Sequence, residues 1–131
     1  MRMTSSHAAI RRGLILGASL ALFPLAADAE PYLSDPAYCD EPIAAAYEAG
    51  VMALYPTGTE TIEYGCNWDA PISFDWSETS TQIRPGYCAE PGEYIYPQVF
   101  VFGMSSSEPG VIQMWSSDVQ TGEATRYVAC E

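Results

Sequence analysis

The densest run of apolar positions covers residues 93–104, where almost every side chain is aliphatic or aromatic. Such residues favour an extended strand. With a period of two, one face carries Tyr94, Tyr96, Phe100, Phe102 and Met104, and the other carries Ile95, Val99 and Val101. Because both faces are apolar, we expect a central strand that is covered on two sides. Pro97 removes one backbone donor, so we also expect a bulge that bends the strand there.

One amphipathic helix is predicted before this strand. Apolar or small side chains recur at three- and four-residue steps over residues 43–54, which is the spacing of one helix face. Pro42 suits the first turn of a helix, and the Pro56-Thr57-Gly58 run is a stop signal. We expect this helix to pack over the sheet or to plug one end of it, and so to cover one face of the 93–104 strand.

Five further strands are predicted from alternation or from short apolar runs between turn residues. They cover residues 60–68, 72–76, 81–84, 111–115 and 124–130. Short connections between consecutive strands favour an antiparallel meander. The predicted fold class is therefore α+β, mainly β: an N-terminal helix packed on a curved antiparallel sheet or small barrel of about six strands, with two disulfides.

The first 29 residues have the pattern of an export signal. Basic residues at Arg2, Arg11 and Arg12 precede an apolar run, and Ala27-Asp28-Ala29 fits the small-x-small cleavage pattern. The apolar run is shorter than the roughly 20 residues that span a bilayer. We predict cleavage near Ala29, a single domain over residues 30–131, a periplasmic or secreted location and no membrane-spanning segment. The arginine pair leaves the general secretory and twin-arginine routes both open.

Four cysteines follow the predicted cleavage site: Cys39, Cys66, Cys88 and Cys130. An even number in a small exported chain predicts two disulfides. The chain-entropy model gives about 4.6 and 3.4 kcal/mol for the nested pairing, and about 3.6 and 4.0 kcal/mol for the sequential one, so it hardly separates them. We favour the nested pairing, Cys39–Cys130 with Cys66–Cys88, because it ties the chain ends together and joins neighbouring strands.

The predicted mature chain is strongly acidic. The full sequence has 17 acidic residues, five arginines and no lysine. Cleavage removes three arginines and Asp28, which leaves two arginines and 16 acidic residues, a net charge of about −14. Such a surface repels nucleic acid and anionic membranes, so we expect neither as a partner. It attracts cationic proteins of the envelope or medium, although the plainer interpretation is a charge coat that keeps the chain soluble.

The residue types of the mature chain exclude several kinds of active site. The only histidine, His7, lies in the export signal, and no lysine or unpaired cysteine is expected. A Ser-His-Asp triad, a Cys-His pair, a Ser-Lys dyad or a histidine metal site therefore cannot be built. No EF-hand loop pattern is present, which leaves only a loose surface cation site open. We predict a protein that is not an enzyme and that uses no metal or cofactor.

A candidate binding surface combines aromatic rings with carboxylates around residues 68–78. Its members are Trp68, Asp69, Asp75, Trp76, Glu78 and, from a later strand, Trp115. Aromatic rings beside carboxylates suit a cationic or sugar-like ligand, or the arginine and lysine side chains of a basic protein. The plainer interpretation is that these rings fill the core.

Three functions are compatible with these patterns. The first is an exported, non-enzymatic interaction module, an inhibitor or accessory subunit, for a basic partner. The second is a barrel that binds a small ligand, which requires an aromatic-lined pocket of several hundred Å³. The third is a carboxylate-based hydrolase, which requires two acids about 5–10 Å apart in a cleft. The acidity and the excluded catalytic groups favour the first, and the oligomeric state stays open.

Overall fold

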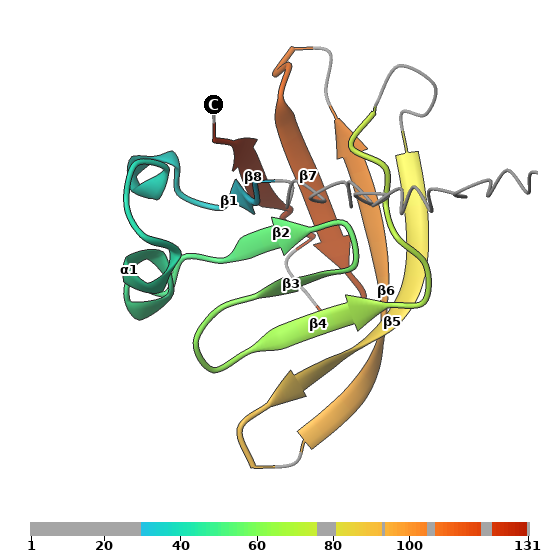
Figure 1. Ribbon diagram of the computed structural model, residues 1–131. Coiled ribbons are helices and arrows are strands. Elements are labelled where there is room, and N and C mark those ends of the chain that lie inside the picture. The colour runs from blue at the N-terminus through green and yellow to red at the C-terminus, as the bar shows by residue number, and fades with distance from the viewer. Residues whose placement is uncertain (1–29, 76–80, 93, 105–106, 119–121, 131) are drawn as a thin grey trace, which may run out of the picture.

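Eight antiparallel strands close into a barrel in the computed structural model, which describes residues 30–75, 81–92, 94–104, 107–118 and 122–130 (Figure 1). The elements in chain order are β1 (Tyr32–Leu33), η1 (Pro36–Tyr38), α1 (Ile43–Glu48), β2 (Ala53–Tyr55), β3 (Gly58–Glu60), β4 (Gly65–Trp68), β5 (Thr81–Glu90), β6 (Tyr94–Met104), β7 (Val111–Ser116) and β8 (Thr125–Ala129). Each strand pairs with its neighbours in sequence, and β1 pairs with β8 to close the barrel. The antiparallel, mainly β meander is confirmed, although eight strands form instead of about six. The predicted export signal lies outside the described residues.

The helix is shorter than its periodic pattern predicts. Only Ile43–Glu48 is helical. Gly50 adopts a φ of +76° just after it, and the Val51 N–H donates to the Ala46 carbonyl at 2.9 Å. This is the Schellman arrangement with which a glycine ends a helix. Leu54, the last residue of the predicted helix face, instead lies in β2 and packs in the barrel core.

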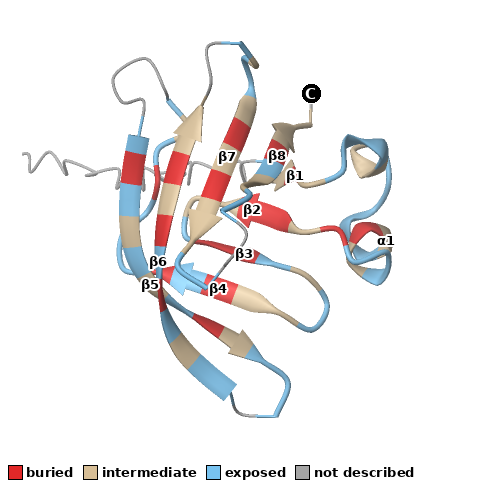
Figure 2. Ribbon diagram, turned by 180° about the vertical axis from the view of Figure 1, so that it is seen from behind, coloured by how far each residue is buried: buried red, intermediate tan, exposed pale blue. Residues whose placement is uncertain are grey.

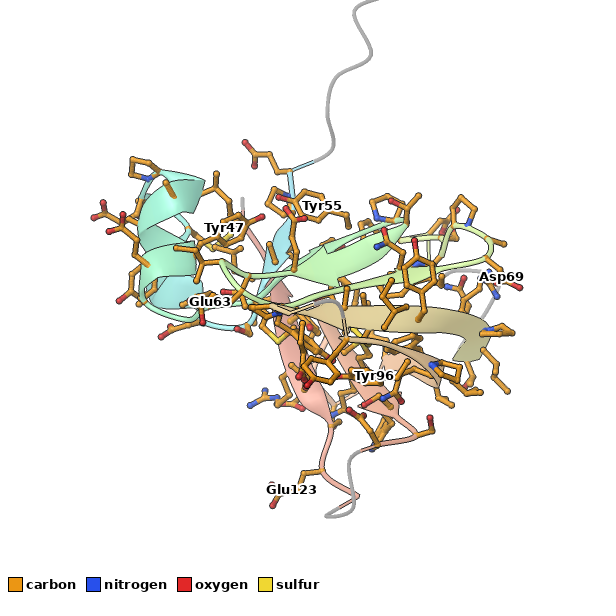
Figure 3. The ribbon with its side chains drawn as sticks, turned by 90° about the horizontal axis from the view of Figure 1, so that it is seen from below. Tyr47, Tyr55, Glu63, Asp69, Tyr96 and Glu123 are labelled. Atoms are coloured by element: carbon orange, nitrogen blue, oxygen red, sulfur yellow. A yellow bond between two sulfur atoms is a disulfide. The ribbon has the colours of Figure 1, made fainter. Side chains whose placement is uncertain are left out.

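The α1 segment lies outside the barrel, beside β1 and β2 (Figure 1). A second apolar cluster forms between them, with Leu33, Ala46, Val51 and Ala53 buried. A polar contact supports the same packing, because the hydroxyls of Tyr47 and Tyr55 are 3.0 Å apart and the Tyr47 hydroxyl also donates to Glu60 (Figure 3). The predicted helix-on-sheet arrangement is therefore correct only in part. The helix covers β1 and β2, and not β6.

Large side chains fill the interior of the barrel. Phe100 and Phe102 are fully buried, and the Trp68 ring lies 5.3 and 5.0 Å from their two rings. The hydroxyls of Tyr127 and Thr59 are 2.9 Å apart across the core, so the buried tyrosine keeps a hydrogen-bond partner. Together these contacts bury the inward side chains of β3, β4, β6 and β8 against one another.

The structure contains two disulfides, in the nested pairing. Cys66 and Cys88 lie opposite each other on β4 and β5 and cross-link these strands inside the barrel. Cys39, after η1, is bonded to Cys130, at the end of β8. The second bond fastens the α1 segment to the last strand of the barrel.

The described part of the predicted 72–76 strand is not a strand. Ile72 is buried in the main core, and the Phe74 ring lies 4.6 Å from that of Tyr32. These contacts anchor the connection between β4 and β5 to the barrel core. The predicted 60–68 strand is in fact two strands, because a turn over residues 61–64 separates β3 from β4. The predicted 81–84 strand is also too short, since β5 continues to Glu90.

The two prolines of β5 and β6 do not interrupt the pairing. The register runs unbroken from Thr81 opposite Gly103 to Glu90 opposite Tyr94, so the bulge predicted at Pro97 is absent. The Val99 N–H points toward β7, where it donates to the Ser117 hydroxyl. Pro97, two residues earlier, has its nitrogen on the same side, beyond the last residue of β6 that pairs with β7. Its missing donor therefore costs no ladder hydrogen bond.

Candidate interaction surface

The two faces of β6 are in different environments. Gln98, Phe100 and Phe102 point into the barrel and are buried, whereas Ile95 is 69% exposed and Val99 is 46% exposed. The alternation is visible along β5 and β6 in Figure 2. The prediction that both faces of this strand are covered is therefore wrong. Its outer face stays exposed because α1 ends after six residues and packs on β1 and β2.

The outer face of β5 is apolar as well, and the register aligns it with that of β6. Four outward pairs lie side by side: Ile83 with Val101, Pro85 with Val99, Tyr87 with Pro97, and Ala89 with Ile95. We call these eight residues the β5–β6 outer face. Six of the eight are exposed, and Ala89 and Val101 are half-buried. At about 3.4 Å per residue, the four pairs extend over about 20 Å.

The apolar surface continues onto β7. Trp115 lies opposite Val101 in the β6–β7 pairing, and directly opposed residues project from the same face of a sheet. Trp115 is half-buried. The outer face of an antiparallel barrel strand is ordinarily polar, so an apolar surface across three strands needs an explanation other than the core.

Exposed carboxylates frame the β5–β6 outer face. The Asp69 N–H donates to the Pro85 carbonyl at 3.0 Å, which places this acid at the β4 side. Ser117 donates through its N–H to the Val99 carbonyl at 3.0 Å, and Asp118 follows it at the β7 side. Glu90 ends β5 at the hairpin; it follows the outward Ala89, so its side chain projects toward the opposite face, where it accepts from Tyr96. Asp118 also lies toward that face, because it accepts from Ser116, which is opposite the inward Phe100. All three acids are exposed, so the apolar centre has an acidic border in which Asp69 lies beside the outer face and Glu90 and Asp118 lie toward the opposite face.

The described residues offer little positive charge to balance these acids. Arg84 donates to the carbonyls of Ala70 and Pro71, each at 3.0 Å, and Arg126 forms an ion pair with Glu108. Both guanidinium groups are therefore engaged within the protein. Of the 17 acidic residues, Asp28, Glu78, Glu93 and Glu131 lie outside the described residues, which leaves 13 carboxylates with these two arginines.

A tyrosine cluster lies at the end of the barrel nearest the β5–β6 hairpin. The Tyr96 hydroxyl donates to Glu90 at 2.9 Å. Burial, together with this hydrogen bond, raises the pKa of Tyr96 above its ordinary value. The Tyr64 hydroxyl lies 3.1 and 3.2 Å from the sulfur atoms of Cys66 and Cys88, and burial raises the pKa of Tyr64 too. Both phenols are neutral near pH 7, so they hold Glu90 and the disulfide in place and supply no nucleophile.

The structure separates the residues of the candidate surface predicted from the sequence. Trp68 points into the core, where its indole N–H donates to the Pro56 carbonyl at 2.7 Å. Trp115 lies outside on β7. Asp69 and Asp75 are exposed on the connection between β4 and β5, and in Figure 3 Asp69 lies across the barrel from α1. Trp76 and Glu78 lie outside the described residues.

The sequence predicts only part of the β5–β6 outer face as a surface of one strand. Ile95, Val99 and Val101 share one face of the strand predicted over residues 93–104, and the sequence predicts that both faces of that strand are covered, one of them by the helix. Period-two alternation tells which residues share a face, but it does not tell what lies over that face. Ile83 lies in the strand predicted over residues 81–84, whereas Pro85 and Tyr87 give less signal, because Pro85-Gly86 indicates the end of that strand.

Comparison with known proteins gives no family for this chain. No family model matches it, and no curated protein or solved structure is significantly similar to it. Among the described residues no helix is long and apolar enough to cross a membrane, and no three histidine, cysteine or acidic side chains gather there as a metal site would require.

Proposed function

We propose that this chain is an exported, non-enzymatic interaction module that binds a basic protein of the cell envelope or the medium, as an inhibitor or an accessory subunit. The observation that carries the proposal is the exposed β5–β6 outer face with its border of carboxylates. Contiguous exposed apolar patches with polar rims are typical of interaction sites. The acidic border gives such a site a preference for cationic partners.

Two features support export. Both disulfides are consistent with an oxidising compartment, since such bonds are rare in the reducing cytosol. The sequence of residues 1–29 has the basic, apolar and small-residue order of a signal peptide. An exported interaction module would meet its partner in the same compartment.

The chemistry of residues 30–130 favours binding over catalysis. This stretch contains no histidine or lysine, and all four cysteines are in disulfides. The tyrosines with the clearest pKa shifts are shifted upward, which makes them weaker nucleophiles at neutral pH. The groups that activate a serine, cysteine or lysine nucleophile are therefore missing from this part of the chain.

The alternative functions gain no support from the geometry. A ligand-binding barrel needs interior space, whereas Trp68, Phe100 and Phe102 pack on one another along the barrel. A depression of about 140 Å³ lies outside the barrel, beside Tyr38 and the Cys39–Cys130 disulfide, and ligand pockets are commonly about 300–1,000 Å³. For a hydrolase, Asp69 and Asp75 are both exposed, and the third candidate acid, Glu78, lies outside the described residues.

Affinity capture followed by reconstitution tests the proposed function. Residues 30–131 are immobilised and exposed to envelope and secreted extracts of the source organism at about 20 mM salt, then eluted at about 0.5 M, where screening is strong. We expect a basic protein that, once purified, re-forms a stoichiometric complex in a salt-sensitive manner. Capture of nothing at low salt, or of a partner whose binding does not respond to salt, contradicts the proposal.

A further inference from the structure

We infer that the β5–β6 outer face is the centre of the interface, and that its occupant is a protein surface with an apolar middle surrounded by lysine and arginine, docked flat on the sheet. This inference rests on the proposed function and adds the place and the chemistry of the contact. Three features of the face carry it: its composition, its edge and its charge.

The composition of the face matches the centre of a protein interface. Charged residues are depleted in interface centres, and tyrosine is enriched there. The eight residues of the face include no charged side chain, and Tyr87, near its middle, is 48% exposed. The fold does not require apolar side chains at these eight positions, because the β-branched threonine would suit an exposed strand position equally well. Their apolar character is explained by contact with another molecule.

The edge of β6 favours docking on the face over addition of a strand. Beyond its pairing with β7, β6 exposes one backbone edge near Ile95 and Pro97. Strand addition would use the donors of that edge. Pro97 has no donor to give, and Ser117 already satisfies the N–H of Val99 at 3.1 Å. At these two positions the edge is protected in the way that natural sheets avoid strand addition, which leaves the Ile95 N–H, whereas the side chains beside the edge stay exposed.

The charge of the border excludes a second copy of this chain as the favoured occupant. Two copies placed face to face would bring together two chains that each carry 13 carboxylates and only two arginines in their described residues, with Asp69 beside the contact. Like charges opposed across an interface cost several kcal/mol. A basic surface reverses the sign of the same contacts. An anionic membrane is disfavoured for the same reason as a second copy.

Three synthetic peptides separate the apolar and cationic requirements. KKLVLVLKK has an apolar centre of about 17 Å between cationic ends, which matches the face in length. KKSGSGSKK keeps the charge and removes the apolar centre, and EELVLVLEE keeps the centre and reverses the charge. Affinities for the chain of residues 30–131 are measured by calorimetry at about 50 mM salt, where charge attraction is only moderately screened. We expect KKLVLVLKK to bind at least tenfold more tightly than either of the other two.

Protein variants then locate the site. Val99→Lys places a cation in the middle of the face, and we expect at least a tenfold loss of affinity for KKLVLVLKK. Ile62→Lys makes the same charge change at a position that is 65% exposed. This position is a control because the next residue, Glu63, lies near α1 in Figure 3, on the side away from Asp69. We expect this matched control to change affinity less than threefold. If the Val99→Lys variant does not fold, the double variant with Ile95→Thr and Val99→Thr replaces it in this test, because both substitutions keep a β-branched side chain.

Each other outcome overturns the inference. Equal losses in Val99→Lys and Ile62→Lys, or equal binding of KKLVLVLKK and KKSGSGSKK, remove the apolar face from the interface. Equal binding of KKLVLVLKK and EELVLVLEE removes the requirement for a cationic occupant. Protection of the Ile95 amide from hydrogen exchange on binding indicates strand addition. A wild-type dimer that Val99→Lys dissociates in sedimentation identifies a second copy as the occupant. In all these cases a salt-sensitive complex with a captured basic protein still upholds the proposed function, whereas the absence of that complex contradicts it.

Discussion

The two faces of β6 predict opposite responses to substitution. Phe102 is fully buried and packs on Trp68 and Phe100, whereas Ile95, on the same strand, is 69% exposed. The informative pair of variants is Phe102→Ala and Ile95→Thr. The first removes a core ring, and the second replaces an exposed aliphatic side chain with one that is also β-branched.

The magnitudes follow from the burial of each side chain. A buried phenylalanine replaced by alanine costs about 3–5 kcal/mol, through lost transfer energy and the cavity left behind. Full burial of isoleucine contributes about 1.5–3 kcal/mol, and less than a third of the Ile95 surface is withdrawn from water. Ile95→Thr should therefore cost less than about 1 kcal/mol, because threonine also keeps the strand preference.

Urea unfolding at pH 7, followed by tryptophan fluorescence with both disulfides intact, measures the two free energies. The slope of the free energy against urea should be similar in all variants, so the midpoints can be compared directly. A cost above about 2 kcal/mol for Ile95→Thr would show that its face is covered in the native state, since substitutions at exposed sites usually stay within about 0.5 kcal/mol. That result would remove the basis of the proposed interface.

Three further predictions concern the stability of the barrel. Replacing both Cys39 and Cys130 with alanine opens a loop with a sequence separation of 91, so the urea midpoint should fall by the equivalent of about 4–5 kcal/mol; a loss under 1 kcal/mol would contradict the role of this bond. Gly86→Ala should destabilise the protein more than Gly50→Ala, because a Cβ at Gly86 would meet the backbone of β4 at 2.2 Å. A Cβ at Gly50 would meet open space, so the only cost there is the positive φ of +76°. Equal melting temperatures of the two variants would contradict this. The pKa of Tyr96 is raised above 10.0 in the folded state, so the unfolded chain loses this proton first and the free energy of unfolding should be constant below about pH 9 and fall above pH 10. Phenolate absorbance and urea midpoints across this range test it, and Tyr96→Phe should reduce the fall.

The strand over residues 94–104 and the meander could be predicted because they depend on local patterns. Continuous apolar alternation identified β6, and short turns fixed the order of the strands. The surroundings of β6 could not be predicted, since Ile95 and Phe102 look equally apolar in the sequence. Closure of the barrel buries Phe102 against Trp68 and Phe100, and α1, which ends before Gly50 and packs on β1 and β2, leaves the face of Ile95 uncovered.

Proline gave the wrong signal in β5 and β6 for a specific reason. A proline is excluded from a strand only where its missing donor faces a paired neighbour. Pro97 faces the edge beyond the last pair with β7, and Pro85 lies one residue beyond Gly86, the last residue of β5 that pairs with β4. These positions depend on the relative lengths of neighbouring strands, which a single sequence does not show.

The sequence places on the candidate surface only Asp69, at its acidic border, and Trp115, on β7. Asp69 does lie beside the exposed apolar face, but Trp68, its neighbour in sequence, points into the barrel. Adjacent residues of a strand face opposite sides, so Trp68 and Trp115 could be assigned to one surface only if the register between β4 and β7 were known. That register depends on three intervening pairings across the barrel.

The most direct test of the proposed interface is the change in backbone amide chemical shifts when KKLVLVLKK is added to isotope-labelled residues 30–131. The account predicts shifts concentrated in residues 83–89 and 95–101, with smaller ones at Trp115 and little change in α1. It also predicts that Val99→Lys abolishes the shifts and that Ile62→Lys preserves them. Shifts centred on α1, or spread evenly over the acidic surface, would contradict the claim that the β5–β6 outer face binds the partner.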